Sequence, residues 1–193
     1  SQPLPNSTLV KLKGMNNSIQ FELQNSEYIA KKLNPSDATI LQHLYEQCTD
    51  YTLLSDGHPP VASAAADEFL ALPLGKNIED KFIFGLFNSH NFLIGVLETI
   101  RHYPDEKSWW IGLMMLAPEY RAKGNGSQFY KAYEKWLAQQ EAQFVFLAVL
   151  EENQLGFAFW QKLGFEVVRI APPQQFGNKV HRRYVMQRQV IEG

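Results

Sequence analysis

The sequence predicts a mixed α/β (α+β) protein, in which a β-sheet of about seven strands carries helices on both faces. Three observations lead to this prediction. In several short stretches apolar residues alternate with polar ones or form a continuous run, as in strands. In other stretches an apolar residue recurs every three to four positions, as in helices. The order of the two kinds, with three strands followed by helix, strand, helix and two strands, is typical of a mixed sheet.

Length and composition favour one domain. The chain has 193 residues, of which 45% are hydrophobic, and this is enough to bury a core. We expect residues 18–193 to form the domain and residues 1–17, which hold two prolines and little periodicity, to be a leader that can stem in part from cloning. There are 18 basic and 20 acidic residues, a net charge of −2. That balance gives no general attraction to nucleic acid or to an anionic membrane.

The sequence also predicts a soluble, cytoplasmic protein. Its longest apolar run, residues 109–117, is about half of the roughly 20 residues that span a bilayer. No secretory signal is recognisable at the start of the chain. The single cysteine, Cys48, excludes an intrachain disulfide, fits a reducing compartment and is expected to fill the core.

The first expected elements form a strand pair. Residues 18–24 alternate strictly, with Ile19, Phe21 and Leu23 on one face, and this predicts a half-buried strand. Residues 28–33 predict a second strand, and the short link between the two permits a hairpin. The free edge of such a hairpin could pair with another copy, so a homodimer is one possible state.

Two helices are expected next. Ser36 or Asp37 is suited to cap the first of them. Residues 50–60 are typical of a turn, because Gly57 and two prolines stop helix propagation. A second short helix is expected over residues 62–72. The apolar side of the first helix is formed by Ile40, Leu41, Leu44 and Tyr45.

Three strands with short polar links are then expected over residues 82–88, 91–103 and 108–116, as an antiparallel meander. An amphipathic helix follows and leads to an apolar strand at 144–150. Because a crossover helix joins parallel strands, 108–116 and 144–150 should run parallel. The apolar face of this helix consists of Phe129, Ala132, Tyr133, Trp136 and Leu137.

The last predicted elements are a helix over residues 153–163, which ends at Gly164, and two strands. The strands cover residues 165–171 and 180–188 and flank a loop at 172–179. A small basic cluster lies near the end of the chain, and a solvated strand face is its expected role, with a phosphate contact as the alternative. The cluster consists of Lys179, His181, Arg182 and Arg183.

The junction between the 108–116 strand and the following helix has the sequence YRAKGNGSQFY, residues 120–130. Gly124 and Gly126 allow the backbone to bend and to approach a ligand closely. The helix start offers unpaired N–H groups and a partial positive charge, and Arg121 and Lys123 add cations. Together these features favour a pyrophosphate, although a plain turn with a helix-capping glycine fits the same residues.

Two motifs resemble those of the GNAT superfamily of acyl-CoA-dependent N-acyltransferases. LAPEYRAKGNGSQFYKAYEKWL, residues 116–137, resembles the cofactor-binding motif of the family, and ENQLGFAFWQKLGF, residues 152–165, resembles its second motif. The resemblance covers approximately residues 28–188. It implies a GNAT-like sheet in which two neighbouring parallel strands splay apart, and acetyl-CoA as the cofactor.

The resemblance implies a role for individual residues. The main chain near Leu116 would pair with the pantetheine arm, and its N–H would polarise the thioester carbonyl, a role worth roughly 3 kcal/mol in comparable sites. Asn153 would contact the cofactor chain and can cap its helix as well. The amides that would cradle the pyrophosphate belong to Arg121, Ala122, Lys123, Gly124, Asn125, Gly126 and Ser127.

Trp160 departs from the family pattern, because many members have a tyrosine beside the cofactor sulfur. An indole N–H donates a hydrogen bond but does not act as an acid. The general-acid role is therefore not carried over, and packing against the pantetheine or the core is the expected role of Trp160.

Glu98 is the candidate general base, or the group that holds an acceptor ammonium. It interrupts an apolar row on the 91–103 strand, and burying an unpaired carboxylate costs several kcal/mol. A salt bridge with a neighbouring basic side chain, or a place at the sheet margin, is the alternative. Tyr51 and Asp56 are the candidate acceptor-binding residues of the 50–60 segment, in which Asp50 and His58 could also contact substrate.

The function predicted is N-acetyltransferase: an acetyl group passes from acetyl-CoA to a primary amine by direct attack in a ternary complex. Two alternatives stay open. Trp160 also suits a non-catalytic acyl-CoA-binding sensor or interaction module, and the glycine-rich junction would suit a phosphate ligand unrelated to CoA. The acceptor is a small molecule or a peptide that the sequence does not identify, and no metal is expected.

Overall fold

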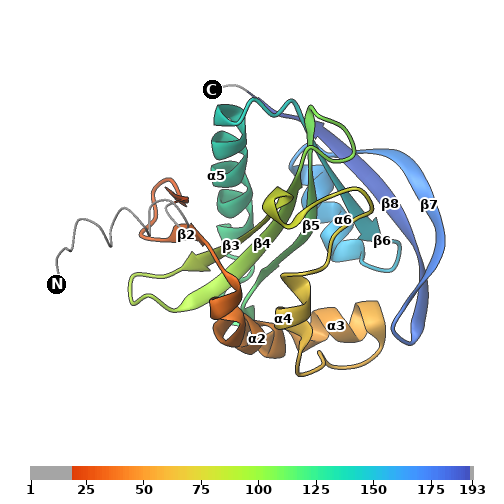
Figure 1. Ribbon diagram of the computed structural model, residues 1–193, viewed down its shortest axis with the longest axis horizontal. Coiled ribbons are helices and arrows are strands. Elements are labelled where there is room, and N and C mark those ends of the chain that lie inside the picture. The colour runs from red at the N-terminus through yellow and green to blue at the C-terminus, as the bar shows by residue number, and fades with distance from the viewer. Residues whose placement is uncertain (1–18, 192–193) are drawn as a thin grey trace.

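The computed structural model describes residues 19–191, so the expected leader lies outside the described residues. Within them, eight strands form one mixed sheet in the order β1-β2-β3-β4-β5-β6-β8-β7 (Figure 1). Each of the eight overlaps a stretch predicted to be a strand, although the total had been put at about seven. The strands are β1 (Gln20–Glu22), β2 (Ile29–Lys32), β3 (Lys81–Phe87), β4 (Leu93–Arg101), β5 (Ser108–Leu116), β6 (Phe144–Leu150), β7 (Glu166–Phe176) and β8 (Lys179–Gln189).

Helices cover both faces of the sheet, as the sequence predicted. Consecutive residues of a strand point to opposite faces, and in β4 Glu98 bonds Tyr45 of α2 whereas Thr99 bonds Tyr133 of α5. The helix α6 packs in the same apolar cluster as α5, and α4 packs with α2. The helices are α2 (Ala38–Gln47), α3 (Thr49–Asp56), α4 (Ala64–Glu68), α5 (Asn125–Gln139) and α6 (Gln154–Lys162).

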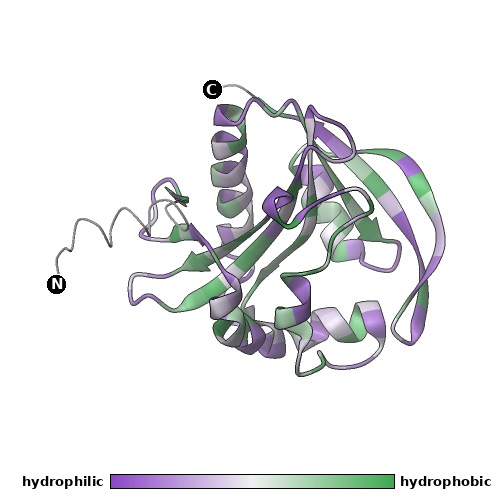
Figure 2. Cartoon of the chain, in the orientation of Figure 1, coloured by the Kyte–Doolittle hydropathy of each residue, from purple (hydrophilic) through white to green (hydrophobic). Residues whose placement is uncertain are grey.

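The central strands are the most apolar part of the chain (Figure 2). Every residue of β3 is buried, and β4 is buried except at its two ends, which are half-buried. Strands β3, β4 and β5 form the expected antiparallel meander. The strands β1 and β2 form the expected hairpin, although both are shorter than predicted. Of the apolar side predicted for α2, Ile40 is exposed, while the other three residues are buried.

Three local predictions were wrong in whole or in part. The 50–60 segment is not a turn: Thr49–Asp56 is the helix α3, which ends at Gly57 with a left-handed φ of 79°. Asp37 is the N-cap residue of α2, as expected, but it makes no capping bond through its side chain: a short 3₁₀ turn comes first, and the Asp37 carboxylate accepts the Asn34 N–H at 2.8 Å. The helix expected over 62–72 is limited to Ala64–Glu68.

The expected loop at 172–179 was also wrong, since most of it belongs to β7. Two prolines, Pro172 and Pro173, lie within this strand. They are tolerated there because β7 is the edge strand of the sheet, and its register with β8 shifts between Ala171 and Gln174. The remaining turn is Gly177-Asn178.

Strands β5 and β6 run parallel, as predicted, and then part. Their pairing extends only from Ser108 opposite Phe144 to Ile111 opposite Leu147. The next residue, Gly112, has no partner on β4, where the register shifts between Glu98 and Thr99. A bulge of this kind bends a strand. Beyond it β5 stays paired with β4 while β6 stays paired with β8, so the sheet opens between them.

Candidate active site

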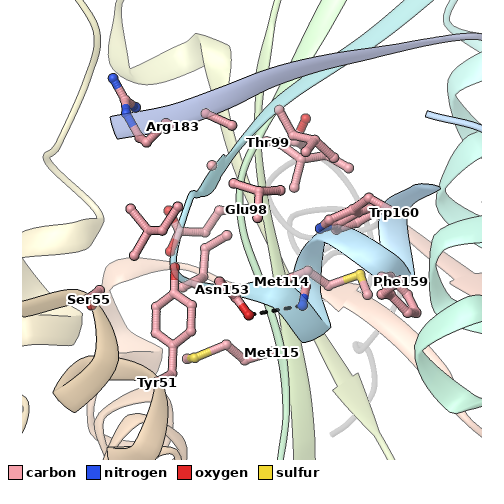
Figure 3. Close-up of a pocket in the computed structure, with 18 of the residues that line it drawn as sticks. Tyr51, Ser55, Glu98, Thr99, Met114, Met115, Asn153, Phe159, Trp160 and Arg183 are labelled. Atoms are coloured by element: carbon pink, nitrogen blue, oxygen red, sulfur yellow. Dashed lines mark hydrogen bonds between the residues drawn. The ribbon is translucent and has the colours of Figure 1, made fainter. Parts of the chain in front are cut away.

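A cavity of about 1650 Å³ lies at this opening (Figure 3). It is lined by residues of β4, β5 and α3, by the loop before α5, by α6 and by the β7–β8 hairpin. Pockets for a single small molecule commonly measure about 300–1,000 Å³. The cavity therefore has room for two reactants side by side.

The loop before α5 presents main-chain donors to the cavity. Ala122 and Gly124 have left-handed φ values of 59° and 83°, and alternation of this kind turns successive N–H groups toward one anion-binding concavity. The first bond of the helix runs from the Gln128 N–H to the Gly124 carbonyl. Within residues 19–191 the amides of residues 122–127 have no protein acceptor. These donors are therefore available to a ligand.

Arg121 differs from the expectation. Its backbone N–H donates to the Pro118 carbonyl at 3.2 Å. Its guanidinium donates to Asp50 at 2.7 and 3.2 Å and to the Leu116 carbonyl at 2.9 Å. The expectation of a free amide and a mobile cation at this position is therefore corrected: Arg121 ties α3 to the end of β5 and to the loop.

Gly126 is needed for packing as well as for access. A Cβ at this position would lie 3.2 Å from Cε1 of Phe159 and 3.7 Å from a methyl group of Leu116. The first turn of α5 thus approaches both α6 and the end of β5 closely. This contact fixes the anion-binding loop against the opening between β5 and β6.

The main chain of Leu116 faces the opening. The Ala117 N–H donates to the Ile94 carbonyl of the β4 side at 2.8 Å, and polar groups of successive strand residues point to opposite edges. The N–H and carbonyl of Leu116 therefore point away from β4. The carbonyl accepts from Arg121 and, at 3.5 Å, from the buried Cys48 thiol. The N–H is turned toward the side on which β6 has parted from β5.

Asn153 and Trp160 frame the other side of the cavity. Asn153 is the N-cap of α6, and its Oδ1 accepts the Gly156 N–H at 2.9 Å, which leaves its side-chain NH₂ group for another partner. Trp160 is 8% exposed and packs edge-on against Tyr130, Phe159 and Phe165. Both residues line the cavity. Contact with a cofactor remains a prediction for each.

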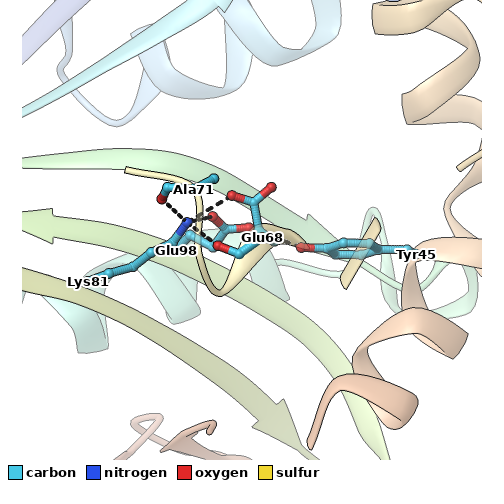
Figure 4. Close-up of polar contacts among 5 residues, drawn as sticks. All are labelled: Tyr45, Glu68, Ala71, Lys81 and Glu98. Atoms are coloured by element: carbon cyan, nitrogen blue, oxygen red, sulfur yellow. Dashed lines mark hydrogen bonds and ion pairs between the residues drawn. The ribbon is translucent and has the colours of Figure 1, made fainter. Parts of the chain in front are cut away.

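Glu98 is buried, at 3% exposure, within a polar network (Figure 4). Tyr45 donates its hydroxyl to Glu98 at 3.0 Å, and Lys81 Nζ lies 3.6 Å from the other carboxylate oxygen. Lys81 also contacts the Glu68 carboxylate at 2.9 Å and donates to the main-chain carbonyls of Glu68 and Ala71. The predicted salt bridge thus exists, and the same carboxylate lines the cavity.

In this environment the pKa of Glu98 is raised well above its usual value. Burial is the main cause, and the Glu68 carboxylate adds to it, while Lys81 and the Tyr45 hydroxyl oppose the shift. A carboxyl group with a raised pKa holds a proton more strongly than an exposed one. It is therefore better matched to accept the proton of an ammonium group.

The predicted acceptor residues Tyr51 and Asp56 both line the cavity, as do Asp50 and His58. Burial, with the nearby Glu98 carboxylate as the next cause, raises the pKa of Tyr51 to about 12, so its hydroxyl keeps its proton at neutral pH. Asp50 is held by Arg121.

The basic cluster near the end of the chain does not form the solvated face that was expected. His181 is 3% exposed, and its Nε2 lies 2.8 Å from the Ser55 carbonyl of α3. Arg183 lines the cavity, whereas Arg182 is exposed and pairs with Glu151. Neighbouring residues of β8 alternate between a covered face and an exposed one. Which residues of the cluster are covered is therefore decided by the register of the strand, and their sequence proximity does not indicate it.

Two further features bear on the chemistry. In the described part of the chain, no cluster of three or more His, Cys, Asp or Glu residues could hold a metal ion. None of the helices in residues 19–191 is both long and apolar enough to cross a membrane.

Solved acetyltransferases share this fold. An acetyltransferase from Thermus thermophilus has a TM-score of 0.69 at 17% identity over 84% of this chain and 96% of its own. A Salmonella typhimurium enzyme that modifies the N-terminal serine of ribosomal protein L7/L12 has a TM-score of 0.74 at 14% identity over 90% and 100%. A chimera of Vibrio cholerae spermidine N-acetyltransferase SpeG and hSSAT reaches 0.67 at 15% over 85% and 96%.

Fold and site together define an α/β acetyltransferase. The model of the acetyltransferase (GNAT) family matches residues 39–165, and the chain belongs to this family. It is thus an N-acetyltransferase, for which the family implies an acyl-CoA donor and an amine acceptor. A search of curated protein sequences gives no significant match.

Proposed function

We propose that this protein transfers the acetyl group of acetyl-CoA to a primary amine by direct attack in a ternary complex. The observation that carries the proposal is the shared cavity beside the opened strand pair. Its lining includes the buried carboxylate of Glu98 and part of the 122–127 loop, whose amides have no acceptor among the described residues. The loop residues in the lining are Ala122, Gly124, Gly126 and Ser127. Acetyl-CoA would supply the acetyl group there as a thioester.

The residues present fit a CoA molecule. The amides from Ala122 to Ser127, together with the start of α5, supply donors for a diphosphate. The opening between β5 and β6 supplies a strand edge, at Leu116, with which an extended amide-containing arm can pair. The NH₂ group of Asn153 lies at the same opening. The diphosphate-binding group of our proposal begins at Ala122, because the amide of Arg121 is engaged by Pro118.

The same residues can assist the chemistry. The Leu116 N–H, turned away from β4, would donate to the carbonyl oxygen that becomes negative during attack, as in an oxyanion hole. Glu98 would take the proton of the acceptor ammonium, whose ordinary pKa near 10 leaves it charged at neutral pH. Trp160 offers no acid, and a thiol of ordinary pKa near 8.5 leaves acceptably as the thiolate.

Direct attack is favoured over an acyl-enzyme because the chain's cysteine is unsuited to be a nucleophile. Cys48 is fully buried and its thiol points to the Leu116 carbonyl. Burial is the main cause that raises the pKa of this thiol, which lowers the thiolate fraction that could attack.

The test is a melting experiment with CoA and acetyl-CoA, followed by thiol release with a panel of amines. A ligand at 100 times its dissociation constant stabilises the folded state by about 2.7 kcal/mol, so a clear rise in melting temperature is expected. Thiol release that depends on an amine would then show transfer. The proposal fails if millimolar cofactor leaves the melting temperature unchanged. Cofactor binding without thiol release across amines, peptides and aminoglycosides would favour the acyl-CoA-binding module instead.

A further inference from the structure

Among residues 19–191, two arginines of the cavity lack the carboxylate partner that every other arginine has. The chain contains six arginines, all within the described residues. Four form ion pairs, namely Arg101 with Asp80, Arg121 with Asp50, Arg182 with Glu151 and Arg188 with Glu134. Arg169 and Arg183 have no such pair within residues 19–191, and both line the cavity.

The sheet register places these two arginines side by side. Arg169 of β7 lies opposite Val185 of β8, two residues from Arg183, and residues two apart share a strand face. Burial, and next the charge of Arg169, lower the pKa of the Arg183 guanidinium. Two like charges near each other without a counter-charge are unfavourable. An anion between them would relieve this repulsion.

Arg183 is held in a defined position. Its guanidinium carbon lies 5.4 Å from the centre of the Phe176 ring, and one NH₂ group donates to Gln174 at 3.0 Å. Its Nε is buried and has no hydrogen-bond partner among the described residues. A buried charged donor without a partner is costly, and an anion held by the other NH groups of the same guanidinium would offset part of that cost.

The hairpin that carries both arginines is fixed against the acceptor side of the cavity. The Asn178 N–H at its tip donates to the Asp56 carbonyl at the end of α3, at 2.8 Å. His181 binds the Ser55 carbonyl of the same helix. Arg183, two residues from His181, therefore lies toward the part of the cavity bounded by α3, where Tyr51 and Glu98 also lie (Figure 3), and Arg169 lies beside it in the sheet.

We propose that the acceptor is a small amine that also carries an oxyanion, a carboxylate or a phosphate, which Arg183 and Arg169 bind while the amino group faces Glu98. This inference rests on the proposed acetyl transfer. The planar fork of arginine matches both oxyanions through paired hydrogen bonds. In the same cavity the Asp56 carboxylate, and Glu98 once it is ionised, suit the ammonium end, so the site offers complementary charge to both ends of a zwitterion.

The first experiment compares matched amines that differ in the anion alone. The wild-type protein with CoA bound is titrated with the standard amino acids and their carboxamides, and with phosphoethanolamine and ethanolamine, while the melting temperature is recorded. At least one anionic amine should bind about 10- to 100-fold more tightly than its uncharged match. A preference in the amino-acid arm indicates a carboxylate, and one in the other arm a phosphate. If no anionic amine binds better than its match, the proposal is wrong.

The second experiment uses Arg183→Gln, with Arg182→Gln as the control at the neighbouring, exposed position. Arg183→Gln should erase the preference for the anionic amine, Arg183→Lys should restore part of it, and Arg182→Gln should leave it intact. With an accepted amine, the loss should appear mainly in KM. Both glutamine variants should bind CoA as the wild type does. Weaker CoA binding by Arg183→Gln alone would mean that the arginines hold the cofactor, which would refute this inference while the acetyl transfer stands.

Discussion

Replacement of Glu98 by glutamine separates the catalytic role proposed for this residue from its structural one. Glutamine has nearly the same shape and can still accept the Tyr45 hydroxyl. The neutral amide resembles the protonated carboxyl that the raised pKa of Glu98 favours. We therefore expect the variant to fold and to bind CoA, but to lose the group that accepts the proton of the ammonium.

The expected loss is large and depends on pH. A positioned general base contributes about 10²- to 10⁴-fold, which corresponds to about 2.7–5.4 kcal/mol of activation free energy at 1.36 kcal/mol per factor of ten. Because only the ionised carboxylate accepts a proton, kcat/KM of the wild type should rise with pH through the raised pKa of Glu98. Glu98→Gln should lack this limb and follow only the ionisation of the acceptor, near pH 10 for a lysine-like amine.

The assay is thiol release at saturating acetyl-CoA between pH 5 and 10, with Glu68→Gln as the matched control. The Glu68 carboxylate is one of the causes that raise the pKa of Glu98. Its removal should lower that pKa and move the limb to lower pH, with little change of the plateau. If Glu98→Gln keeps the wild-type rate and pH profile, Glu98 serves only the ion pair with Lys81, and the assigned base is wrong.

Two further predictions concern the loop and the buried cation. Gly124→Ala and Gly75→Ala replace glycines with φ of 83° and 85° and nothing within 4 Å of the new methyl group, so each should lose about 1–2 kcal/mol of stability. In calorimetric titration only Gly124→Ala should weaken CoA binding, and equal CoA affinities would contradict the assigned loop. Lys81→Met should cost about 3–5 kcal/mol in denaturant unfolding at neutral pH. The pKa of Glu98 is higher in the folded state, so protonation of Glu98 stabilises the fold fully below the usual pKa near 4.5, and this stabilisation is lost as pH rises. The penalty for Lys81→Met should therefore shrink toward pH 4, where the carboxyl is neutral. A cost that does not depend on pH would contradict the reasoning.

The geometry of the loop proposed to hold the cofactor was largely predictable because its parts are contiguous. The end of β5, the loop and the start of α5 occupy residues 116–127, and the residue types needed for an anion cradle lie together in that stretch. The one correction there, Arg121, depends on Asp50, which is 71 residues away in sequence. Local pattern indicates where amides become free, but it does not indicate which side chains are already paired.

The structure of the region proposed to bind the acceptor was predicted less well, since distant segments build it. Helix α3 was missed because its sequence, TDYTLLSD, has weak helix formers and is followed by a glycine and two prolines. Contacts with the β7–β8 hairpin hold it in place. The arginine pair was missed for a similar reason: Arg169 and Arg183 become neighbours only because the register shifts between Ala171 and Gln174.

One irregularity links the two halves of the site. The unpaired Gly112 ends the pairing of β5 with β6, and this opens the space proposed for the cofactor. The same glycine lies beside Glu98, since a Cβ at position 112 would be 4.0 Å from the carboxylate oxygen Oε1. A larger side chain there would extend over the carboxylate and could cover it. The bulge thus parts the strands at the point where the carboxylate is left accessible, so the proposed donor site and the proposed base must lie close together.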